Sequence, residues 1–212
     1  MQLQLPDKID KKQWSRFLGM KDEDLAGEDA DRCQHQLMET ARPQGFFVYS
    51  DKLDYPGQAM KKHLAGCRKS VIMGVTLGRS IDDLITKLEI TDMKMAVLAD
   101  TGASVLADMT ADLFQEQIRS QLPEDMPYMT SRFSPGYGDF PLSAQRDIIR
   151  MLDAERKIGL TLNESNLMIP MKSVTAIAGI SDKPVKGYLA GCDECLLKSK
   201  CEKRKEGRIC GI

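Results

Sequence analysis

Hydrophobic residues follow strand periodicity at three places along the chain. Residues 46–49 form a short apolar run, and residues 71–77 form the longer run of a buried strand between chain-breaking residues. Within residues 160–180, apolar positions alternate at Val174, Ala176, Ala178 and Ile180. Alternation with a period of two places successive side chains on opposite faces of a sheet. These segments predict the strands.

Apolar residues at helical spacing predict helices between these strands. Residues 1–56 mix helical stretches with loop signals, and residues 57–66 predict a short helix that ends at Gly66. Ser80 is predicted to cap a helix, and residues 92–120 are rich in helix formers but interrupted by Gly102. Residues 143–158 predict a further helix, which ends at Gly159. The predicted buried positions are Ile81, Leu84, Ile85, Leu88, Leu106, Met109, Leu113 and Ile118.

Two segments do not follow either periodicity. Residues 122–142 contain four prolines and therefore predict a long irregular loop, a kind of segment that is often functional. The last residues are short, charged and rich in cysteine. We expect a main domain over residues 1–188 and a cysteine-rich tail over residues 189–212.

Composition restricts the classes of function. Hydrophobic residues make up 42% of the 212, enough for a folded core. Thirty basic and thirty-one acidic residues give a net charge of −1, which argues against a nucleic-acid partner. We see no signal-peptide pattern and no apolar run near the roughly 20 residues of a membrane helix. The expected location is cytoplasmic, without a membrane partner.

Four cysteines cluster in the tail with the spacing C-x₂-C-x₅-C-x₈-C. In a reducing compartment, such a cluster fits an iron–sulfur cluster or a tetrathiolate zinc site, and free thiols on a basic tail are the alternative. Cys33 and Cys67 stand apart and are expected to be buried or idle thiols. The candidate metal ligands are Cys192, Cys195, Cys201 and Cys210.

The segment Arg132-Phe-Ser-Pro-Gly-Tyr137 combines residue types suited to a charged nucleoside ligand. Arginine can hold a carboxylate through a charge-assisted, often bidentate pair. Ser134, Pro135 and Gly136 offer a rigid backbone that a flat base can approach closely. Tyr137 can place an aromatic face on the nucleoside or near a cation.

This segment and its sequel resemble the activation domain of cobalamin-dependent methionine synthase, which binds S-adenosylmethionine through R-x-x-P-G-Y. The family continues with D-x-E-x-x-x-G-x-x-L-x-E-S, and here residues 153–165 carry the same letters. Met168 and Pro170 extend the match, so the resemblance covers about residues 100–182. It also reaches upstream, where Asp108 takes the place of an acidic ligand contact that is Glu in the family. The family's late tyrosine contact falls nearest Tyr188.

The resemblance implies an α+β fold, with a curved, twisted antiparallel β-sheet and flanking helices. It implies a methyltransferase-associated reactivation protein that supports reductive methylation of a corrinoid, with no general acid or base. The cobalamin is supplied by a partner, either a corrinoid-binding protein or a methionine synthase lacking its own activation domain. An electron donor such as flavodoxin or ferredoxin is implied too, and this need for an electron favours iron–sulfur over zinc in the tail.

Neither histidine is expected to ligate cobalt. The sequence H-x-x-G at His63 matches half of a cobalamin-binding signature, but Lys61 stands where that signature has its orienting aspartate. His35 is expected to be an ordinary surface residue. Two alternative functions remain open: a non-catalytic docking or scaffold module of a corrinoid methyltransferase system, and a metal or iron–sulfur adaptor defined by the tail.

Overall fold

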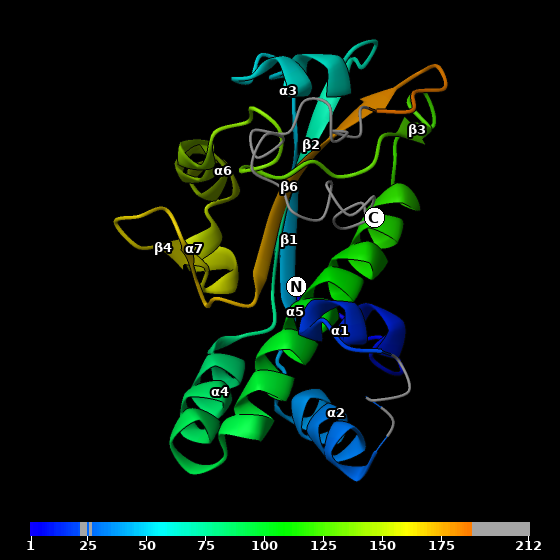
Figure 1. The fold of residues 1–212 in the computed structure, drawn as a ribbon. Coiled ribbons are helices and arrows are strands. Elements are labelled where there is room, and N and C mark those ends of the chain that lie inside the picture. The colour runs from blue at the N-terminus through cyan, green and yellow to red at the C-terminus, as the bar shows by residue number, and fades with distance from the viewer. Residues whose placement is uncertain (22–24, 26, 188–212) are drawn as a thin grey trace, which may run out of the picture.

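A computed structural model describes residues 1–21, 25 and 27–187 of the protein. At its centre is a four-stranded antiparallel sheet in the order β1–β2–β6–β3, with helices on both sides (Figure 1). Beside it lies a small hairpin of two strands, β4 and β5. The strands are β1 (Gln44–Ser50), β2 (Lys69–Thr76), β3 (Tyr128–Met129), β4 (Thr161–Leu162), β5 (Met168–Ile169) and β6 (Ser173–Ser181).

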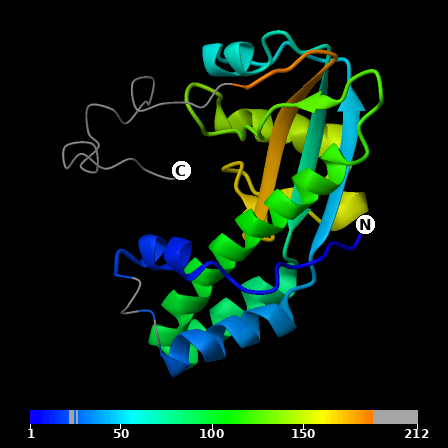
Figure 2. The same cartoon turned by 90° about the vertical axis from the view of Figure 1, so that its right-hand side faces the viewer.

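The helices of the described residues fall into two groups, one on the sheet and one beyond its end (Figures 1 and 2). Helix α5 is the longest and belongs to both groups, because its first half packs on other helices and its second half packs on the sheet. The helices are α1 (Lys11–Leu18), α2 (Glu28–Thr40), α3 (Gln58–His63), α4 (Arg79–Thr91), α5 (Met93–Arg119), α6 (Gln145–Leu152) and α7 (Ala154–Ile158).

The period of two in the central strands divides the core between the two faces of the sheet. Val71, Met73 and Val75 of β2 pack against the second half of α5. Ile72 of the same strand and Ile177 of β6 pack on the opposite face, against α3, α6 and α7. Both faces are therefore covered, and the predicted α+β fold with an antiparallel sheet and flanking helices is confirmed.

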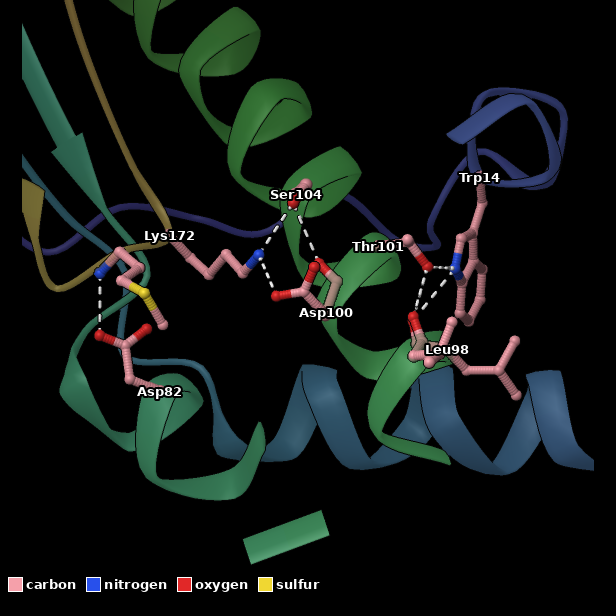
Figure 3. Close-up of polar contacts among 9 residues, drawn as sticks. Trp14, Asp82, Leu98, Asp100, Thr101, Ser104 and Lys172 are labelled. Atoms are coloured by element: carbon pink, nitrogen blue, oxygen red, sulfur yellow. Dashed lines mark hydrogen bonds and ion pairs between the residues drawn. The ribbon is translucent and has the colours of Figure 1, made fainter. Parts of the chain in front are cut away.

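Gly102 does not interrupt α5, contrary to the prediction from sequence. A Cβ at this position would lie 2.7 Å from the indole ring of Trp14, which is fully buried between α1 and α5. The indole N–H donates to the carbonyl of Leu98 at 3.1 Å and to the hydroxyl of Thr101 at 3.0 Å (Figure 3). Glycine is required at position 102 because the Trp14 ring occupies the space that a Cβ would need.

Three other local predictions are wrong. Ser80 does not cap α4, because the helix begins at Arg79 with Gly78 at the N-cap position, and the Ser80 hydroxyl donates instead to the carbonyl of Thr40 at 2.8 Å. The helix predicted over residues 143–158 is divided at Asp153, whose φ of 50° ends α6 before α7 begins. Leu113 is exposed on the outer side of α5.

Polar contacts connect the start of β6 to the helices. The Lys172 ammonium is largely buried, and it donates to the Asp100 carboxylate at 2.7 Å and to the Ser104 hydroxyl at 3.0 Å (Figure 3). The backbone N–H of Met171 donates to Asp82 of α4 at 2.8 Å. These contacts fix the segment that leads into β6 against α4 and α5. Among the described helices, none is both long and apolar enough to cross a lipid bilayer.

Candidate functional site

Residues 130–133 run along the edge of the sheet beside β6, although the sequence predicted an irregular loop. The backbone N–H of Thr130 donates to the carbonyl of Gly179 at 2.9 Å. Phe133 and Ile177 exchange both backbone hydrogen bonds, each at 2.9 Å. Arg132 therefore lies between two residues whose backbones are anchored to a central strand.

The Arg132 side chain extends to α5, where it meets two carboxylates one helical turn apart. One guanidinium nitrogen donates to Asp108 and the other to Asp112. The backbone carbonyl of Asp108 accepts a further hydrogen bond at 3.3 Å. Burial of the guanidinium opposes its charge, but the two carboxylates outweigh that effect and raise the pKa of Arg132 above its ordinary value.

The three side chains form a cluster with a net charge of −1. Arg132 is only 15% exposed, whereas Asp108 and Asp112 are 54% and 61% exposed. The carboxylates therefore face solvent while the guanidinium lies behind them. Such a cluster can bind a ligand that carries both a carboxylate and a cation, because each ligand charge finds an opposite charge at hydrogen-bond distance.

Residues 134–140 form a compact turn beside this cluster. The Gly136 N–H donates to the Phe140 carbonyl at 2.8 Å, and the Phe140 N–H donates to the Tyr137 carbonyl at 3.0 Å. Gly136 has a φ of 93°, a conformation that L side chains rarely adopt, so glycine is needed at this point. Pro135 is buried, Ser134 is half-buried, and Tyr137 is 63% exposed. The Tyr137 ring is therefore exposed on the surface, in the same loop as Arg132.

Helix α3 is joined to this loop at its N-terminus. The Asp139 carboxylate accepts from the backbone N–H groups of Gln58 at 2.6 Å and Ala59 at 2.9 Å. These bonds hold the pKa of Asp139 below its ordinary value. Glycine is needed at position 57 because a Cβ there would lie 2.8 Å from Asp139. A residue of the loop therefore caps a helix about eighty positions earlier in the chain.

The structure brings together most of the predicted ligand residues. Arg132 contacts Asp108, and the turn from Ser134 to Tyr137 follows directly in the chain. Asp112 was missed as a candidate, although its spacing of four residues from Asp108 on a helix places both on one face. The binding role of these residues stays a prediction. Tyr188 and the predicted metal ligands Cys192, Cys195, Cys201 and Cys210 lie outside the described residues.

The other singled-out residues have ordinary or structural surroundings. His35 is exposed and lies 3.3 Å from Glu39, as expected of a surface residue. Cys33 is buried and Cys67 is half-buried, and burial raises the pKa of both thiols, that of Cys33 to about 12. His63 is buried against the Arg132 segment. Within residues 1–21, 25 and 27–187, no group of three or more His, Cys, Asp or Glu side chains is placed to hold a metal ion.

Comparison with known proteins assigns the family. Residues 61–189 match the family described as the vitamin B12-dependent methionine synthase activation domain. The chain belongs to this family, which confirms the resemblance found in the sequence. No curated protein matches it. Among solved structures, it is similar to the MetH reactivation domain bound to AdoHcy, with a TM-score of 0.61 and 18% sequence identity. That similarity covers 94% of this chain and 82% of the other and shows the shared fold.

Proposed function

We propose that the protein binds S-adenosylmethionine and supports reductive methylation of a corrinoid carried by a partner methyltransferase. The observation that carries this proposal is the cluster of Arg132, Asp108 and Asp112 beside the turn at residues 134–137. Membership of the activation-domain family supports it. The related MetH domain was solved with AdoHcy, the product that remains after S-adenosylmethionine has donated its methyl group.

The cluster suits the charges of S-adenosylmethionine. The ligand has a carboxylate, an ammonium and a sulfonium, so its net charge is positive while that of the cluster is negative. In the proposed complex, the ligand carboxylate takes one edge of Arg132, and the Asp112 carboxylate released from that edge takes the ammonium. Asp108 keeps its pair with Arg132, and its exposed carboxylate also contacts the ligand ammonium, the role that the resemblance implies for this position. The backbone of Ser134–Gly136 receives the adenine edge, and the Tyr137 ring covers the nucleoside. The late tyrosine contact assigned to Tyr188 belongs to the same proposal.

The proposed reaction needs three participants. One electron, from a donor such as flavodoxin or ferredoxin, reduces the cobalt of the partner's corrinoid from Co(II) to Co(I). The methyl group then leaves the sulfonium for the reduced cobalt, giving methyl-Co(III) and AdoHcy. Methyl transfer removes the reduced form and so drives an otherwise unfavourable reduction. The protein's contribution is positioning and exclusion of water, which requires no acid or base from the chain.

The partner is proposed to be a corrinoid-binding protein or a methionine synthase without its own activation domain. Calorimetric titration with S-adenosylmethionine tests the first step, and we expect saturable binding at one site. Adding the protein to an inactive Co(II) methionine synthase lacking its activation domain, with a reductant and S-adenosylmethionine, should restore activity. Absence of binding at millimolar ligand would reject the proposal. Binding of the corrinoid protein without binding of S-adenosylmethionine would instead identify a docking module.

A further inference from the structure

We infer that His63 is a positioning residue for Arg132 and that helix α3 holds in place the loop that carries Arg132 and Tyr137. The inference rests on the proposed function for its effect on ligand affinity. The sequence around His63 argues against a cobalt ligand, and the structure packs its ring against the segment that carries Arg132. The side chain is 1% exposed and lies against the residues on both sides of Arg132.

The hydrogen bonds of the imidazole define which nitrogen carries a proton. Nε2 of His63 lies 2.9 Å from the backbone carbonyl of Ser131 and 3.0 Å from the hydroxyl of Thr130. A carbonyl oxygen only accepts hydrogen bonds, so Nε2 must carry a hydrogen and act as the donor. Thr130 completes the network, because its hydroxyl accepts from the Gly179 N–H and donates to the same Ser131 carbonyl, both at 2.9 Å.

Fixing this one carbonyl orients Arg132. The carbonyl of Ser131 and the N–H of Arg132 belong to one planar peptide unit, so holding the oxygen prevents rotation of the unit that starts Arg132. On the other side of Arg132, the Phe133 ring packs against the imidazole with centroids 5.1 Å apart. His63 therefore contacts both chain neighbours of Arg132 and makes its backbone direction a property of the fold.

Helix α3 contacts this loop at a second point. The N-terminus of α3 is capped by Asp139, at the far end of the same loop, while His63 is the last residue of the helix. One helix thus holds the segment that carries Arg132 and the turn that carries Tyr137. This arrangement keeps the charged and aromatic parts of the site at a fixed separation, which lowers the ordering cost of binding.

The test compares His63→Leu, which removes the donor, with His63→Gln, whose amide can supply an N–H near the position of Nε2. The matched control is His35→Leu, a change at the exposed histidine. Affinity is measured for S-adenosylmethionine and for 5′-methylthioadenosine, which lacks the amino-acid part. Hydrogen–deuterium exchange of residues 130–133 is measured without ligand.

We expect His63→Leu to weaken S-adenosylmethionine about 10-fold, to leave 5′-methylthioadenosine within about 2-fold, and to speed exchange at residues 130–133. His63→Gln should restore both affinity and protection. The inference is wrong if His63→Leu, while folded, keeps wild-type affinity and exchange. It is also wrong if both ligands weaken equally or if glutamine gives no rescue, since these results indicate a general packing role.

Two provisions keep the outcome decisive. If His63→Leu does not fold, Thr130→Val tests the same carbonyl, with Thr130→Ser as the control that keeps the hydroxyl. If the wild-type protein binds no S-adenosylmethionine, the proposed function fails, and the exchange of residues 130–133 alone decides whether His63 positions Arg132.

Discussion

Replacing Arg132 by alanine should separate ligand binding from folding. In the ligand-free protein, Arg132 has two carboxylate partners, and in the proposed complex it has one of these and the ligand carboxylate. In Arg132→Ala, Asp112 is free to pair with the ligand ammonium, so the change removes only the contact between the guanidinium and the ligand carboxylate. That charge-assisted pair is worth about 1.5–3 kcal/mol, and the exposed Arg132–Asp112 pair that it replaces is worth about 0–1 kcal/mol, so Arg132→Ala should weaken S-adenosylmethionine roughly 3- to 100-fold.

The cost of the same change to stability should be small. Asp108 and Asp112 are both more than half exposed, and water can hydrate them when the guanidinium is removed. Pairs of this kind contribute about 0–1 kcal/mol each, which corresponds to a few degrees in melting temperature for a protein of this size. Folded Arg132→Ala protein should therefore be available for titration.

Calorimetry with two ligands provides the decisive comparison. The affinity of 5′-methylthioadenosine should stay within about 2-fold in Arg132→Ala, because this ligand has no carboxylate. Asp112→Asn and Asp108→Asn should each weaken S-adenosylmethionine by about 2- to 10-fold, since a partly exposed partner contributes less than a buried one. Unchanged S-adenosylmethionine affinity in Arg132→Ala would refute the carboxylate contact, and equal weakening of both ligands would show that the loop itself had been disrupted.

Three further changes test other parts of the structure. Gly102→Ala should lower the free energy of unfolding by about 1–3 kcal/mol in a thermal melt, despite alanine's helix propensity, because its Cβ would overlap the Trp14 ring. Burial raises the pKa of Cys33 from 9.0 to about 12, so the folded state keeps a proton that the unfolded state loses between these values, and this contribution to stability should fall as pH rises through them. Cys33→Ala should therefore reduce the fall of stability with pH in denaturant titrations. Anaerobic purification should give a brown protein containing iron and sulfide, and Cys195→Ser or Cys201→Ser should lose the colour but keep S-adenosylmethionine binding. Zinc in place of iron would indicate a structural tail, and a metal-free protein with titratable thiols would contradict a metal centre.

The central fold could be predicted because its signals are local and strong. The run at residues 46–49 lies within β1, the run at residues 71–77 overlaps β2 up to Thr76, and the alternation at residues 174–180 lies within β6. Errors arose where a tertiary contact decides the local conformation. Gly102 looked like a helix breaker because the buried indole that requires it comes from a residue far away in the sequence.

The candidate site was predictable only in part for the same reason. Arg132 and the turn at Gly136 were visible because a short continuous motif carries them. Asp112 was detectable in principle, through its spacing from Asp108, but nothing in the sequence says which carboxylate on a helix faces an arginine twenty residues later. The side chains of His63 and Asp139 contact backbone groups that are far away in the sequence, and no residue pattern predicts such contacts.

The candidate site is assembled from several elements of the fold, so an isolated loop could not form it. The carboxylates come from α5, the arginine from a segment paired with β6, and the supports from α3. Each is held by contacts that exist without ligand, so in the proposed complex the ligand exchanges ion pairs within an assembled cluster. Under the proposed function, affinity for S-adenosylmethionine should therefore respond more to the orientation of Arg132 than to the number of charges around it.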